Sequence, residues 1–143
     1  MVFSINNFFD ENNKKSKIAD FQDLDHIDGI SISTVSAGLY DHKRDDLVLF
    51  YFRDGASHAS VFTQSKIVSE NIKWNKNIKS KKLSALLINT RNANALTGID
   101  GFNSLKVLSN DLSSHLTAKQ KIDEENPKEI KSNEILFACT GTI

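Results

Sequence analysis

The sequence predicts an α/β (α+β) fold, a mixed β-sheet with helical cover. Short apolar runs typical of strands occupy the first half of the chain and its C-terminal end. A stripe of apolar residues at helical spacing lies between the last two runs. No internal repeat or low-complexity linker divides the 143 residues. We therefore expect an irregular extension over residues 1–27 and one domain over residues 28–143.

The first half of this domain has the pattern of an antiparallel meander. Ile30–Ser36 alternates apolar and polar side chains, and Asp46–Phe52 is a nearly continuous run of aliphatic and aromatic residues. The dipeptide Asp54-Gly55 is a strong turn signal, so we expect the second strand to end there. A third strand is then expected over Ser57–Gln64.

The second half predicts a strand–helix–strand unit after a short helix within Ser65–Asn77. Leu83–Thr90 is rich in aliphatic residues, which suits a strand buried on both faces. A loop and an amphipathic helix of about 16 residues follow, with Ser113 on its polar face. Glu134–Cys139 is expected to be the last strand. The apolar stripe of the helix consists of Phe102, Leu105, Leu108, Leu112 and Leu116.

Composition excludes several classes of function. The 18 basic and 18 acidic residues cancel, so no overall field favours nucleic acid or an acidic membrane. No signal peptide or membrane-spanning run is evident, and the single cysteine, Cys139, allows no disulfide within the chain. We therefore expect a cytoplasmic protein. The histidines show no metal-ligand spacing, and none is expected to bind a metal: His26, His42, His58 and His115.

Two loops are the candidate sites. Asn92–Gly98 holds two asparagines before a glycine, which is typical of a tight, internally hydrogen-bonded turn. Thr140-Gly141 follows the last strand, where a hydroxyl and a backbone N–H can face a developing negative charge. The residues alone leave three interpretations open. The loops are ordinary turns, they form an oxyanion hole, or the first loop binds a small anion.

Taken in order, three segments resemble one enzyme family. They are SVFTQSK at 60–66, LLINTRNANALTG at 86–98 and ILFACTGTI at 135–143. Together with HKRDDLVLF at 42–50, they are similar to the ornithine acetyltransferase / glutamate N-acetyltransferase family of arginine biosynthesis. The family versions of the three segments read GVFTTN, VVNSGNANACTG and STGVIG. The resemblance covers roughly residues 28–143 and implies the N-terminal part of a layered αββα fold.

The resemblance also implies a mechanism. In this multifunctional family a precursor cleaves itself, and the new N-terminal threonine carries acetyl from N2-acetyl-L-ornithine to L-glutamate. The oxyanion-stabilising roles fall on Thr140 and Gly141. The resemblance implies no cofactor and no metal. The loop residues expected near the site are Asn92, Asn94, Thr97 and Gly98.

Departures from the family pattern shape the remaining expectations. Arg91 replaces a glycine, so we expect its backbone to avoid strongly positive φ, and Leu96 replaces a frequent cysteine. The nucleophile and cleavage motif lie beyond the matched segments in the family. We expect a truncated chain that is inactive alone and has the rest of the α chain and the β chain as partners in a hetero-oligomer. The carboxylate of Ile143 would repel an oxyanion at Thr140. The alternative is an inactive relic that acts only as a structural or interaction domain.

Overall fold

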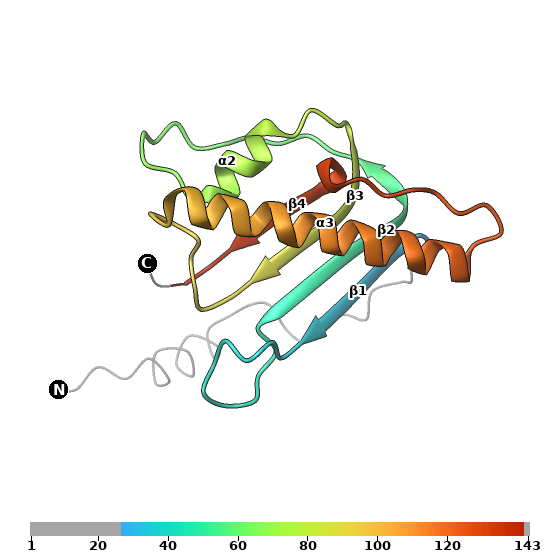
Figure 1. Cartoon of the computed structure of the whole chain (residues 1–143), viewed down its shortest axis with the longest axis horizontal. Coiled ribbons are helices and arrows are strands. Elements are labelled where there is room, and N and C mark those ends of the chain that lie inside the picture. Colours follow the sequence, from blue (N-terminus) through green and yellow to red (C-terminus); the bar gives the residue numbers. More distant parts are fainter. Residues whose placement is uncertain (1–26, 142–143) are drawn as a thin grey trace, which may run out of the picture.

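The computed structural model describes residues 27–141, and these form a four-stranded mixed sheet (Figure 1). The expectations for the extension over residues 1–27, for His26 and for Ile143 fall outside this range, apart from residue 27 itself. The strand order is β1-β2-β3-β4. The first three strands are antiparallel, and β4 is parallel to β3. The strands are β1 (Ile30–Val35), β2 (Leu47–Ser57), β3 (Lys82–Asn89) and β4 (Ile135–Cys139).

Both α-helices lie on one face of the sheet. The long helix α3 (Gly98–Asp123) runs across that face, and α2 (Glu70–Asn77) lies beside its N-terminal end (Figure 1). A 3-10 turn, η1 (Ser132–Glu134), leads into β4. Trp74 of α2 packs against Phe102 and Phe137, with ring centroids 5.8 and 5.7 Å away. The core comprises Tyr51, Ala85, Leu87, Leu105, Leu116, Ile130, Ile135 and Phe137.

The opposite face of the sheet is also apolar. Residues paired across neighbouring strands point to the same side, so the register defines the members of this face. Ile32 pairs with Phe50, Phe50 with Leu86, and Leu86 with Leu136. Among residues 27–141 no helix lies over this face, because both α-helices pack on the other side. Its apolar residues are Ile30, Ile32, Val48, Phe50, Phe52, Leu86, Ile88, Leu136 and Ala138, which we call the open face.

The predicted third strand over Ser57–Gln64 is wrong. β2 continues through Asp54-Gly55 to Ser57, with an irregular register between Tyr51 and Ala56, and residues 58–69 contain no strand. Gly55 has φ +77°, and a Cβ there would overlap the side chain of Lys82. The glycine therefore forms a bulge that lets β2 keep pairing with β3, instead of the turn that Asp-Gly usually signals. The meander exists, with β3 as its third strand.

The helix predicted after the Asn92–Gly98 loop is present as α3, but it is longer than predicted, and its buried face differs from the predicted apolar stripe. α3 has 26 residues, and Leu108 of the predicted stripe is 42% exposed. Ser113, assigned to the polar face, is buried together with Ser109. Their hydroxyls donate to the carbonyls of Lys106 and Asn110 within the helix, both at 2.9 Å. Small side chains whose hydroxyls are satisfied inside the helix can therefore line its buried face.

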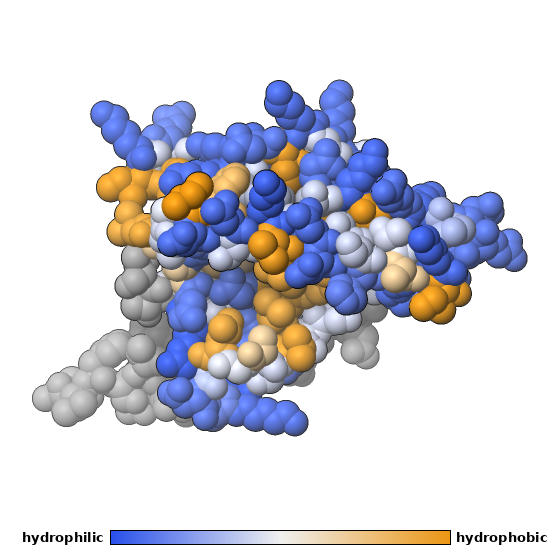
Figure 2. Space-filling view, in the orientation of Figure 1, coloured by the Kyte–Doolittle hydropathy of each residue, from blue (hydrophilic) through white to orange (hydrophobic). Residues whose placement is uncertain are grey.

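The outer surface of α3 is mainly hydrophilic (Figure 2). Separate apolar side chains interrupt this hydrophilic surface. None of the helices in the described range is long and apolar enough to cross a membrane. The exposed apolar residues of α3 are Ile99, Val107, Leu108 and Ile122.

Candidate functional site

The two candidate loops meet at one edge of the sheet. β3 and β4 are parallel neighbours with Asn89 opposite Cys139, so their carboxyl ends lie side by side. The backbone N–H of Thr140 donates to the carbonyl of Asn89 at 2.9 Å, which extends the pairing one residue beyond β4. The structure therefore brings together segments that are about fifty residues apart in the sequence.

Gly141 packs against the backbone of Arg91. Its φ is +136°, and an added Cβ would overlap the Arg91 carbonyl carbon and oxygen. Only glycine satisfies both the backbone angle and the close approach. Thr140 and Gly141 are exposed. Within residues 27–141, neither the Thr140 hydroxyl nor the Gly141 N–H has a hydrogen-bond partner.

Asn94 links the loop to three elements. Its side-chain amide donates to the side-chain oxygen of Asn71 in α2 at 3.1 Å and to the carbonyl of Gly101 in α3 at 3.2 Å. Its backbone N–H lies 3.3 Å from the Cys139 sulfur of β4. The hydroxyl of Thr97 donates to its side-chain oxygen. The prediction of a tight, internally hydrogen-bonded loop is confirmed.

The remaining predicted loop residues shape its two ends. The carbonyl of Asn92 accepts a hydrogen bond from the Asn89 side chain at 2.8 Å, and its N–H donates to the Thr90 carbonyl at 2.9 Å. Gly98 begins α3 with φ +62°. Both residues therefore set the path of the backbone as it leaves β3 and enters α3.

The expectation that Arg91 avoids positive φ is wrong. Arg91 has φ +70° and Leu96 has φ +59°, both in the left-handed region that favours glycine. The turn keeps its geometry because its backbone is fixed by Gly141 on one side and by the Asn94 contacts on the other. The Arg91 guanidinium lies 5.3 Å from the Tyr40 ring centroid and 3.6 Å from a carboxylate oxygen of Asp41.

Asp46 is a buried residue of this region that the sequence analysis missed. Its carboxylate accepts the backbone N–H of Ala37 at 2.7 Å and of Leu39 at 2.8 Å, and its carbonyl accepts the N–H of Thr90 at 2.9 Å. The hydrogen bond from Ala37 is the largest influence that lowers the pKa of Asp46. Asp46 thereby joins the β1–β2 connection to the end of β3. Its place in the charged run HKRDD concealed this role.

The other candidate side chains are not brought together. His58 and His115 each lie close to a backbone carbonyl, Ser80 at 3.1 Å and Asp111 at 2.7 Å. His42 lies 5.7 Å from the Tyr40 ring. Within residues 27–141, no group of three or more histidine, cysteine, aspartate or glutamate residues could hold a metal ion.

These features define an α/β protein whose candidate site lies at the carboxyl ends of two parallel strands joined by a long helix. The model of the ArgJ family matches residues 31–143, and the chain belongs to this family.

Named relatives agree with this assignment. The arginine biosynthesis bifunctional protein ArgJ of Zymomonas mobilis is 37% identical over 95 residues, which cover 66% of this chain and 23% of that protein. The protein of the same name from Bartonella henselae is 30% identical over 149 aligned positions, covering 100% of this chain and 30% of the relative. The chain thus spans less than a third of the length of these relatives.

Two solved structures share the fold. Ornithine acetyltransferase from Mycobacterium tuberculosis, complexed with ornithine, aligns with a TM-score of 0.71 and 24% identity, over 81% of this chain and 57% of that one. The ArgJ protein of Bacillus halodurans aligns with a TM-score of 0.64 and 24% identity, over 81% and 55%. These likenesses confirm the predicted α/β class.

Proposed function

We propose that this chain is the oxyanion-stabilising part of an acetyltransferase that moves acetyl from N2-acetyl-L-ornithine to L-glutamate in arginine biosynthesis. The observation that carries the proposal is the Thr140-Gly141 pair, exposed at the end of β4 with its hydroxyl and N–H unpaired within the described range. Membership of the ArgJ family and the names of the relatives support the reaction class.

The proposed reaction needs a nucleophile, which the resemblance to the family assigns to an N-terminal threonine beyond the matched segments. An N-terminal threonine hydroxyl attacks the acetyl carbonyl carbon, and its proton passes to the amine of the same residue. The carbonyl electrons move to oxygen, and this oxyanion accepts hydrogen bonds from the Thr140 hydroxyl and the Gly141 N–H. Collapse breaks the C–N bond, and ornithine leaves with the transferred proton. Glutamate then takes the acetyl group by the reverse sequence.

The Asn94 contacts have a supporting role in this proposal. They hold the turn that carries Arg91, and the Arg91 carbonyl limits the path of Gly141. Oxyanion donors stabilise a transition state most when they are already in position, because moving them into place during the reaction would cost free energy. A firmly bonded loop that holds the backbone of Gly141 in place is therefore what the proposed chemistry requires.

The test is acetyl transfer in a reconstituted pair. The chain is co-expressed with the remaining part of the Bartonella henselae relative, and transfer from N2-acetyl-L-ornithine to glutamate is measured. We expect turnover only with both polypeptides. We expect Thr140→Ala to lower kcat by about 10²–10³-fold and Thr140→Ser to restore most of it. Ser114→Ala, which removes an exposed hydroxyl of α3, serves as the control.

Two results separate the alternatives. Turnover that Thr140→Ala leaves unchanged would refute the oxyanion assignment while keeping the acetyltransferase. A stable complex without turnover would favour the second candidate, an inactive structural or interaction domain. The strained backbone at Arg91, a residue foreign to the family pattern, is the observation that favours this second candidate.

A further inference from the structure

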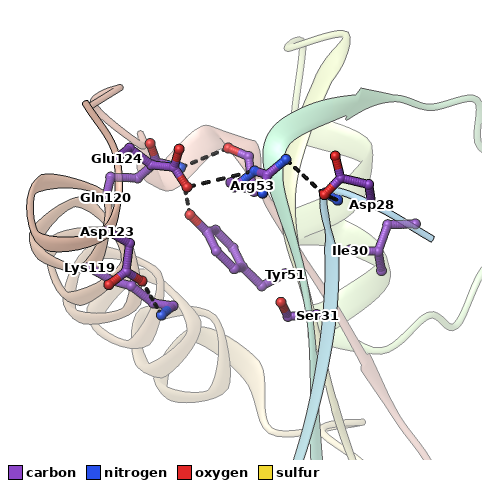
Figure 3. Close-up of a pocket in the computed structure, with 10 residues that line it drawn as sticks. Asp28, Ile30, Ser31, Tyr51, Arg53, Lys119, Gln120, Asp123 and Glu124 are labelled. Carbon is purple, nitrogen blue, oxygen red and sulfur yellow. Dashed lines mark hydrogen bonds and ion pairs between the residues drawn. The ribbon is translucent and has the colours of Figure 1, made fainter. Parts of the chain in front are cut away.

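A cavity lies away from the candidate site, between the C-terminal turns of α3 and the strands β1 and β2 (Figure 3). Its volume is about 240 Å³. Tyr51 lines the cavity and pairs with Ala85 of β3. The candidate site lies beyond Asn89 of β3, which pairs with Leu47, four residues before Tyr51 in β2. β1 and β4 are opposite edges of the sheet. The two places are therefore separate.

The inner wall of this cavity is buried and hydrogen-bonded. Tyr51 is 6% exposed and Gln120 is 2% exposed. The Gln120 amide donates to the Tyr51 hydroxyl oxygen at 2.6 Å and to the Arg53 carbonyl at 2.7 Å, and its oxygen accepts the N–H of Lys128 at 3.2 Å. Because Gln120 donates to the Tyr51 oxygen, the hydroxyl proton is left to donate elsewhere. The cavity is thus lined by a hydrogen-bond donor, the Tyr51 hydroxyl.

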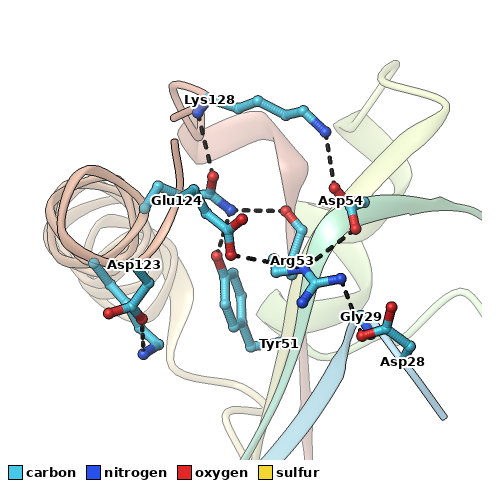
Figure 4. A network of polar contacts seen from close by, with 10 residues as sticks. Asp28, Gly29, Tyr51, Arg53, Asp54, Asp123, Glu124 and Lys128 are labelled. Carbon is cyan, nitrogen blue, oxygen red and sulfur yellow. Dashed lines mark hydrogen bonds and ion pairs between the residues drawn. The ribbon is translucent and has the colours of Figure 1, made fainter. Parts of the chain in front are cut away.

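Charged groups of both signs surround this donor (Figure 4). Arg53 forms ion pairs with Asp28 at 3.0 Å and with Glu124 at 3.7 Å, and Lys119 pairs with Asp123. These five lining residues carry three negative and two positive charges. The carbonyls at the C-terminal end of α3 add partial negative charge. The lining therefore favours a ligand with a net positive charge.

Glu124 is the least engaged of these carboxylates. Among residues 27–141 its side chain accepts no hydrogen bond, and its closest cation is the Arg53 Nε at 3.7 Å. It follows Asp123, the last residue of α3, and lies on the same side of the cavity as the Tyr51 hydroxyl, with Lys119 about one turn earlier in the helix (Figure 3). Two hydrogen-bond donors, the Tyr51 hydroxyl and the Lys119 ammonium, and one acceptor without a hydrogen bond in the described range, the Glu124 carboxylate, thus line the same cavity.

We propose that this cavity binds a small basic amino acid, which has one carboxylate and two ammonium groups. Its carboxylate accepts from the Tyr51 hydroxyl and the Lys119 ammonium, and an ammonium group donates to Glu124. The single net positive charge of such a molecule balances the single net negative charge of the lining. The volume equals that of about eight water molecules at liquid density, which is the size range of an amino acid. The inference is independent of the proposed acetyl transfer.

The test is an NMR titration of the full 143-residue chain with L-ornithine, L-norvaline and L-glutamate. L-Norvaline has a similar carbon chain without the second amine. We expect saturating amide shifts at Tyr51, Lys119 and Gln120 with L-ornithine, and binding at least about tenfold weaker for the other two. No saturation at about 10 mM L-ornithine, or equal binding of all three, would overturn the proposal.

Variants locate the binding. Glu124→Gln is expected to weaken L-ornithine binding about tenfold, since it removes the charge that receives the ammonium group. Asp111→Asn removes the same charge from an exposed position of α3 outside the cavity and is expected to leave binding unchanged. Both variants should keep the dispersed amide spectrum of the parent chain. If the two weaken binding equally, the effect is one of overall charge and the proposal is wrong.

Discussion

Arg91 occupies a backbone conformation that costs a non-glycine residue about 1–2 kcal/mol. Its compensating contacts are weak, because Asp41 is 94% exposed in its side chain and such surface pairs contribute little. We expect Arg91→Gly to raise the free energy of unfolding by up to about 1 kcal/mol. Urea unfolding followed by circular dichroism measures the change.

A matched substitution separates backbone strain from side-chain effects. Arg91→Val also removes the guanidinium, but a β-branched residue at φ +70° is a stronger outlier than arginine. We expect the valine variant to be less stable than the glycine variant by at least about 1 kcal/mol. Equal stabilities would show that the left-handed conformation is not what limits this position.

Asp46 makes the stability of the fold depend on pH. Its hydrogen bonds from Ala37 and Leu39 lower its pKa in the folded chain below the unfolded value. The ionised carboxylate therefore stabilises the fold at pH values above about 3.9, and this contribution is lost as the pH falls through the depressed pKa. We expect Asp46→Asn to be less stable than the parent at pH 7, with a smaller difference at pH 3. Asp111→Asn should show no such difference in urea midpoints.

Residue-level roles were only partly predictable from the sequence. The Asn-Ala-Asn-Ala string indicated a bonded turn because asparagine bonds its neighbouring backbone. The partner Asn71 could not be found, since a contact across 23 residues leaves no local pattern. Gln120 does have such a local pattern, because it lies four residues after Leu116 and therefore on the same buried face of the helix.

At the scale of elements, the Asn94 side chain bonds the loop to α2 and α3 at the sheet edge. Asn94→Ala removes donors to Asn71 and Gly101 and an acceptor for Thr97. We expect a loss of about 2 kcal/mol in the free energy of unfolding. Asn92→Ala is the control, because within the described range only its backbone is bonded. A similar loss in both variants would contradict a specific role for Asn94.

The helix α3 offers a matched pair of leucines. The apolar stripe predicted both Leu105 and Leu108 to face the core, but they are 6% and 42% exposed. We expect Leu105→Ala to cost about 2–4 kcal/mol of stability and Leu108→Ala less than about 1 kcal/mol. Thermal and urea unfolding of the two variants compare them directly.

The two element-level errors have physical causes. Asp54-Gly55 can serve a turn or a bulge, and the choice is made by pairing with β3, which local sequence does not encode. The face of α3 was misjudged because serine counts as polar, although Ser109 and Ser113 bond inside the helix and are buried. In both cases tertiary packing overrides a correct local preference.

At the scale of the whole molecule, the sheet is covered by helices on one side only within residues 27–141. The open face carries nine apolar residues, and Ile32 on it is 60% exposed. An apolar sheet face gains about 25 cal/mol for each Å² removed from water. β1 is also an edge strand of the described sheet, so it can pair with another strand.

We therefore expect the chain to self-associate through the open face when no other polypeptide is present, because a second copy buries the same apolar residues. Ile32→Lys places a charge in the middle of the contact and should shift the equilibrium toward monomer. Val107→Lys adds the same charge to an exposed apolar position of α3, which is 60% exposed on the other side of the sheet, and should have no effect. Sedimentation velocity over a range of concentrations distinguishes the two. A monomeric parent chain, or equal dissociation by both lysines, would show that the open face is not the contact.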